Sequence, residues 1–112
     1  MRGVLIAAID PAVPAAGPGA TLDVVVFDPE LAWQRARSVA LRPEPFGALV
    51  YHFSTRKLSF LKSRTLVEVV ETLADHPSAT ATLAARGVPD AQRRAYVSAL
   101  ADLARSRMIE RR

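Results

Sequence analysis

Alternating apolar and polar positions between residues 38 and 62 predict three short antiparallel strands. Residues 38–42 alternate as a half-buried strand does, and Pro43 and Pro45 are expected to end that strand. Residues 48–53 are apolar on both faces, which predicts a central strand that is covered on both sides. The three strands together predict a small sheet that needs helices to bury its apolar face.

The third predicted strand, residues 56–62, has a lysine near each end, which is typical of a sheet edge. Leu58 and Phe60 fall on one face of it and Leu61 on the other, and the alternation favours Phe60 as a core residue. An edge strand offers unpaired N–H and C=O groups to which another polypeptide can add as a further strand. This strand is therefore the most promising binding element in the sequence.

Apolar residues at helical spacing predict three helices after the strands. The first is expected to begin with a capping box at residues 65–68, and the second to follow Ser78 and stop at Gly87. The third should run from Asp90, its expected N-cap, to about Ser106. The buried stripe of the first helix is predicted to be Leu66, Val69, Val70 and Leu73. The fold class is thus α+β and winged-helix-like, a three-stranded antiparallel sheet followed by three helices (βββααα).

The N-terminal part of the chain has a different composition. Residues 1–22 are expected to be a non-core extension, because their second half carries three prolines, two glycines and no charge. Residues 23–37 are interpreted as a connector and residues 38–112 as the folded domain. An alternative is that residues 4–9 or 23–27, both strand-like, pair with the sheet.

Composition narrows the function classes. The absence of cysteine among the 112 residues excludes disulfides, thiolate metal sites and cysteine nucleophiles. No apolar run reaches the roughly 20 residues of a membrane-spanning helix, and we expect a cytoplasmic protein without a membrane partner. The formal net charge of +4 favours anionic partners. No phosphate loop, metal-ligand cluster or nucleophile–base pair is recognisable, so we predict neither an enzyme nor a cofactor.

The stretch RPEPFGALVYHFSTRKLSFLKSRTLVEVV, residues 42–70, resembles the peptide chaperones of mycofactocin biosynthesis, which belong to the PqqD-like family of precursor-peptide recognition domains. The resemblance is close over residues 38–74 and does not cover residues 1–22. It implies a non-catalytic protein that binds the leader of a ribosomally synthesised precursor peptide. The leader would lie as an added strand beside the third strand, facing the third helix. Delivery to a radical S-adenosylmethionine maturase is the implied role.

Carried over by position, the resemblance implies a binding surface on the third strand and the third helix. Leu58 or Leu61 with Tyr96, Val97 and Leu100 is expected to form an apolar trough for the leader. The expected peptide-binding residues are Lys57, Leu58, Ser59, Phe60, Leu61, Lys62, Arg93, Arg94, Tyr96, Val97 and Leu100. Lys57, Lys62, Arg93 and Arg94 are the cations that would attract leader carboxylates.

The same residues also have structural interpretations. Tyr96 and Leu100 could simply pack the helix on the sheet, and Arg93 and Arg94 could be solvated surface. His52 is expected to be a packed or hydrogen-bonded side chain rather than a ligand. A proline at Ser59 is predicted to weaken leader binding, provided that the Ser59 N–H points outward.

Two other functions fit the sequence less well. A DNA-binding winged helix needs several basic or amide side chains on its recognition helix, but the second predicted helix supplies one arginine. We therefore expect no nucleic acid partner. A structural subunit without a peptide ligand is the other alternative.

Overall fold

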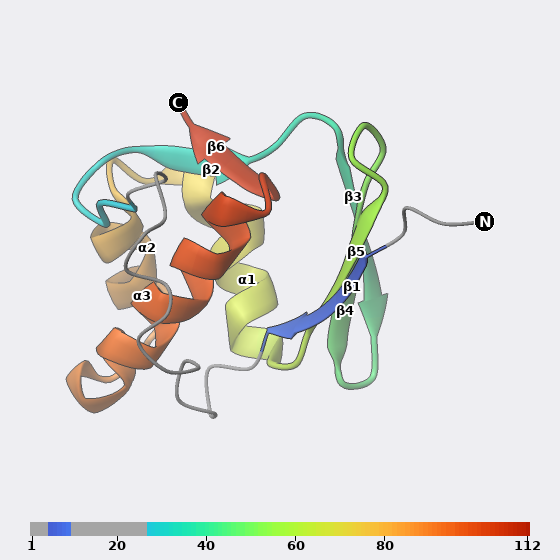
Figure 1. The fold of residues 1–112 in the computed structure, drawn as a ribbon. Coiled ribbons are helices and arrows are strands. Elements are labelled where there is room, and N and C mark those ends of the chain that lie inside the picture. The colour runs from blue at the N-terminus through green and yellow to red at the C-terminus, as the bar shows by residue number, and fades with distance from the viewer. Residues whose placement is uncertain (1–4, 10–26) are drawn as a thin grey trace.

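The computed structural model describes residues 5–9 and 27–112, with the side chains of residues 5–8 excepted. Its main sheet contains an antiparallel meander of β3 (Val39–Glu44), β4 (Gly47–His52) and β5 (Lys57–Leu61). β1 (Leu5–Ile9) lies parallel to β5, so the strand order is β1-β5-β4-β3. The alternative in which an N-terminal segment pairs with the sheet therefore holds for Leu5–Ile9 (Figure 1).

The helices α1 (Arg64–Thr72), α2 (Ala79–Ala85) and α3 (Asp90–Arg105) follow the sheet in the chain, and a short 3-10 turn, η2 (Leu73–Asp75), extends α1. All three helices lie on one side of the main sheet (Figure 1). The α+β class, with a three-stranded antiparallel sheet and three helices, is confirmed.

The ends of the helices follow local chemistry. Ser63, in an extended conformation, caps α1, because its hydroxyl accepts a hydrogen bond from the Leu66 N–H at 3.1 Å. The prediction of a capping box at residues 65–68 is therefore wrong. Ser78 caps α2 as predicted, and Gly87 follows it with a φ of +79°. Asp90 is the first residue of α3 rather than its cap.

The core lies between the main sheet and the helices. The predicted stripe of the first helix is confirmed, since Leu66, Val69 and Leu73 are fully buried and Val70 is nearly so. β4 contributes the side chains of Ala48, Val50 and His52 to the same core. The further fully or almost fully buried large side chains are Leu61, Leu83, Leu100, Leu103, Met108 and Ile109.

A second, two-stranded sheet joins the connector to the C-terminal end. β2 (Trp33–Arg35) pairs antiparallel with β6 (Ile109–Arg111) (Figure 1). The indole N–H of Trp33 donates to the Asp28 carbonyl at 2.8 Å, and the ring is 5% exposed. The connector is thereby attached to the folded body.

Two predictions about the main sheet are wrong. β3 continues through Pro43 to Glu44, because β3 is an outer strand and a proline there can leave its missing N–H on the unpaired side. β4 is covered by helices on one face only, and Phe53, just beyond its end, is exposed. The apolar residues of its second face thus have no helix above them (Figure 1).

Candidate functional site

The outer flank of β5 is defined by the direction of its main-chain groups. The Lys62 N–H donates to the Ile9 carbonyl at 2.9 Å, so this group points toward β1. Main-chain directions alternate along a strand, and therefore Leu58 and Phe60 also present their N–H and C=O groups to β1. Lys57, Ser59 and Leu61 turn theirs toward β4.

β1 occupies this flank along its whole length. The parallel register places Ile6 beside Leu58, Ala8 beside Phe60 and Ile9 beside Leu61. The prediction that the third strand is a free edge is therefore wrong for this conformation. The segment that pairs with β5 has the place that the resemblance gives to a guest peptide.

The Ser59 N–H does not point outward, which was the condition for a proline at this position to weaken leader binding. Its register partner is Val50, its N–H points toward β4, and its side chain is 2% exposed. A proline at Ser59 would therefore break the ladder between β4 and β5 and would report on folding rather than on the flank. The positions that address the flank through main-chain groups are Leu58, Phe60 and Lys62.

The side chains of β5 divide between the two faces of the sheet. Leu61 faces the helices and is fully buried. Leu58 and Phe60 are half-buried on the opposite face, where the Phe60 ring meets the Phe46 ring edge to face at a centroid distance of 5.8 Å. The interpretation of Phe60 as a core residue is therefore wrong. Lys57 is half-buried and Lys62 is exposed.

The predicted residues of α3 differ in their access to solvent. Tyr96 and Leu100 are buried, and the Tyr96 hydroxyl is 3.2 Å from the Ser63 hydroxyl. Val97 is half-buried and packs against the core. Tyr96, Val97 and Leu100 thus share the helix side of the sheet with Leu61, whereas Leu58 lies on the other side.

The two arginines of α3 also differ. Arg94 is exposed, and Arg93 forms an ion pair with Asp90 at 3.0 Å. The Nε atom of Arg93 is buried and has no hydrogen-bond partner within the described ranges. An unpaired N–H of this kind can donate a hydrogen bond to a peptide carbonyl or carboxylate.

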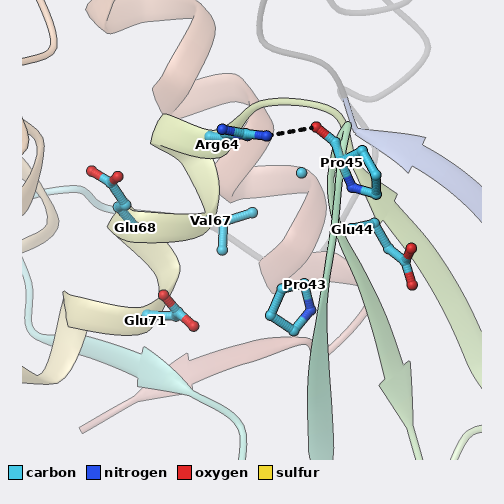
Figure 2. A pocket seen from close by; sticks show the side chains of 8 residues that line it. Pro43, Glu44, Pro45, Arg64, Val67, Glu68 and Glu71 are labelled. Carbon is cyan, nitrogen blue, oxygen red and sulfur yellow. Dashed lines mark hydrogen bonds between the residues drawn. The ribbon is translucent and has the colours of Figure 1, made fainter.

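Two hollows lie away from this flank. One, of about 470 Å³, lies between α1 and the turn that joins β3 to β4, where Arg64 donates to the Pro45 carbonyl at 3.4 Å (Figure 2). Val67 lies between the helix and the strand there, and Glu44, Glu68 and Glu71 are also among the residues that line the hollow. The sequence does not predict this hollow, because the residues of α1 and of the turn are distant in the chain.

The other hollow, of about 540 Å³, lies near the turn between β4 and β5 and includes His52, Arg107 and Arg111. The Nδ1 atom of His52 accepts hydrogen bonds from the Ser54 and Thr55 N–H groups at 3.1 and 3.2 Å. The prediction of a hydrogen-bonded histidine is confirmed. Among the described residues no group of three or more histidine and carboxylate side chains could hold a metal ion. No helix in that part of the chain is both long and apolar enough to cross a bilayer.

Comparisons with known proteins identify the family. The model of the peptide chaperone MftB family matches residues 32–110. The peptide chaperone MftB of Mycolicibacterium smegmatis is 58% identical over 85 residues, which cover 76% of this chain and 83% of that protein. That of Mycobacterium ulcerans is 51% identical over 109 residues, which cover 97% and 94%. That of Mycobacterium tuberculosis is 50% identical over 97 residues, which cover 87% and 89%.

No solved structure matches the chain. The relatives are named as peptide chaperones, a non-catalytic family, and this confirms the prediction that the protein is not an enzyme. The match includes the strands β3 to β5 and the three helices but not β1. From the family model and the three relatives, the chain belongs to the peptide chaperone MftB family.

Proposed function

We propose that this protein binds the leader of a ribosomally synthesised mycofactocin precursor by strand addition and presents it to a radical S-adenosylmethionine maturase. The observation that carries the proposal is that the outer flank of β5 pairs with an added strand, β1. Membership of a family named for peptide chaperones supports the same proposal. The winged-helix, PqqD-like assignment of the fold and a cytoplasmic location are part of the same proposal.

The leader would replace β1 beside β5. The flank offers the main-chain groups of Leu58, Phe60 and Lys62, and a strand laid there has α3 on the helix side of the sheet. The bonds that hold β1 would be exchanged for equivalent bonds to the leader, so the main chain contributes little to the net free energy. Affinity must then come from leader side chains. Burying two aliphatic ones would contribute about 3–5 kcal/mol before the ordering cost of about 2–5 kcal/mol.

The opposite edge of the main sheet, strand β3, is less suited to strand addition. The Phe53 N–H donates to the Ser38 carbonyl at 2.7 Å, so Ser38, Ala40 and Arg42 turn toward β4. The outward residues of β3 are then Val39, Leu41 and Pro43. The N–H of Val39 donates to Ala36 and Pro43 has none, which leaves Leu41 as the single outward donor of β3.

Charge would assist capture of the leader. Lys62 and Arg94 are exposed, Lys57 is half-buried, and the buried Nε of Arg93 lacks a partner within the described ranges. These cations would attract leader carboxylates and raise the association rate, an effect that falls as salt screens it.

A pair of proline substitutions in β1 tests the exchange. The Ile9 carbonyl faces β5, so Ala7 also directs its N–H to β5 while Ala8 directs it away. We expect Ala7→Pro to loosen β1 and to tighten leader binding by roughly two- to tenfold, because the lost hydrogen bond is worth about 0.5–1.5 kcal/mol. Ala8→Pro is the matched control and should leave the affinity nearly unchanged. Calorimetry with the synthetic leader gives both values.

Three results would contradict these expectations in different ways. An absence of heat and of amide chemical-shift changes with the wild-type protein would refute peptide binding altogether. Weaker binding by Ala8→Pro, with Ala7→Pro unaffected, would show that the leader adds to the outer side of β1. Weaker binding by Ala7→Pro would show that the docked β1 is part of the site.

A further inference from the structure

The face of the main sheet that points away from the helices carries a continuous set of apolar side chains. This outer sheet face consists of Phe46, Leu49, Tyr51, Phe53, Leu58 and Phe60. Four of the seven aromatic residues of the chain lie on it. In Figure 1 no helix covers this side of β3, β4 and β5.

The strand register makes these side chains neighbours. Leu49 lies beside Phe60, and Tyr51 lies beside Leu58. The rings of Tyr51 and Phe53 meet edge to face at a centroid distance of 5.6 Å. The outer sheet face is therefore a single patch rather than scattered apolar residues.

The core does not require this patch. Phe46 is 44% exposed and Phe53 58% exposed, and the core of the domain lies on the opposite face of the same strands. When one face of a sheet meets water, the strands normally place polar side chains on that face. Clustered, exposed aromatic side chains on such a face are instead typical of the centre of a protein interface.

The border of the outer sheet face is mostly cationic. Arg42 lies in register beside Leu49; its side chain is 79% exposed and forms an ion pair with the Glu44 carboxylate at 3.3 Å. Lys62 and Arg56 are exposed near the ends of β5, and Glu44 is the acid at this border. A second copy would bring the same cations against each other, which disfavours self-association. A partner with carboxylates around an aliphatic or aromatic centre is complementary.

We infer that the outer sheet face is a docking surface for a folded protein whose contact area is apolar and bordered by carboxylates. The inference rests on the proposed function, under which this partner is the maturase. The outer sheet face and the outer flank of β5 share Leu58 and Phe60. The side chains of these two residues point to the outer sheet face, and their main-chain groups point to the flank. A protein docked there would lie against the strand beside which the leader is bound.

Phe53→Ser tests the inference, because Phe53 is the most exposed of these aromatics and its replacement leaves the core intact. We expect binding of the purified maturase to weaken by about tenfold or more, as for an aromatic residue at an interface centre. Leader affinity should stay within about twofold, since the flank is unchanged. Glu71→Ser, an exposed change on α1, is the control and should affect neither. Calorimetry measures both affinities, and circular dichroism verifies folding.

Arg42→Glu provides a second measurement. This substitution should slow association with the maturase. Added salt should then raise, rather than lower, the contribution of this position to the association rate. Unchanged maturase affinity in both Phe53→Ser and Arg42→Glu would overturn the inference while leaving leader binding as proposed. Concentration-dependent dimers of the wild type that Phe53→Ser abolishes would also overturn it, because the occupant would then be a second copy. Failure of the wild type itself to bind the maturase would refute that part of the proposed function.

Discussion

Gly47 is the position where one added methyl group should do the most damage to this fold. It begins β4 with a φ of +151°, a region that residues with a side chain rarely adopt. A Cβ atom built there would lie 1.9 Å from the Leu61 carbonyl oxygen and 3.0 Å from the Ser63 nitrogen. Both neighbours are main chain, so the strand ends must separate to admit it.

The cost of Gly47→Ala has two parts. The backbone conformation contributes about 1–3 kcal/mol of strain for a residue other than glycine. Displacing the packed backbone contributes a similar amount, about 1–3 kcal/mol. We therefore expect the free energy of unfolding to fall by about 4 kcal/mol, a large fraction of the 5–15 kcal/mol typical of a domain.

Gly87→Ala separates the two parts. Gly87 also has a positive φ, +79°, but a Cβ there meets no atom within 4 Å in the described part of the chain. Strain of about 1–2 kcal/mol, partly offset by the lower entropy of the unfolded chain, should leave a loss of about 1 kcal/mol. The clash with Leu61 is thus the main difference between the two variants.

Urea denaturation followed by circular dichroism measures both losses. At about 4 °C per kcal/mol, the melting temperature should fall by about 15 °C for Gly47→Ala and by about 4 °C for Gly87→Ala. Equal losses in the two variants would refute the close approach of β4 to the end of β5. The same result would remove the reason for a glycine in the RPEPFGAL motif.

The remaining predictions concern the helix side of the sheet. Ser63→Ala should lower the free energy of unfolding by about 1–2 kcal/mol, because it removes the α1 cap and the contact with the Tyr96 hydroxyl. Tyr96→Phe removes only that contact and is the control. Equal losses of stability for the two variants in thermal melts would contradict the role of Ser63 as a cap. Leu100→Ala should lose about 3 kcal/mol in urea denaturation, because Leu100 is fully buried. Val97→Ala should lose about 1 kcal/mol, and a loss as large as that of Leu100→Ala would argue against a half-exposed Val97.

The sequence predicted much of the fold because local patterns carry that information. Helical spacing identified the buried stripe of α1, and Ser78 and Gly87 marked the ends of α2 correctly. The cap of α1 was placed on the wrong residue, because Ser63 and Thr65 are both suitable side chains and the turn geometry decides between them. The motifs of residues 42–70 identified the family without any tertiary information.

The candidate site depended more on tertiary structure. Alternation along residues 57–61 separates two faces, but it does not say which face meets the helices. The sequence therefore favoured Phe60 for the core, whereas Leu61 and Ser59 hold that position. The same choice of register decides which N–H groups point outward. The residues that present them to the flank are Leu58 and Phe60, not Ser59.

The chain by itself determined the succession of three strands and three helices and both ends of α2, because these follow from patterns among residues close in the chain. It also determined the family and the lack of cysteine chemistry. Only the tertiary structure decided that Leu5–Ile9 docks on β5, since the apolar segment LIAAI is equally compatible with an extension and with a strand. Pairing between segments about 50 residues apart is a long-range choice, and it depends on which sheet flank is left open when the helices have covered one face.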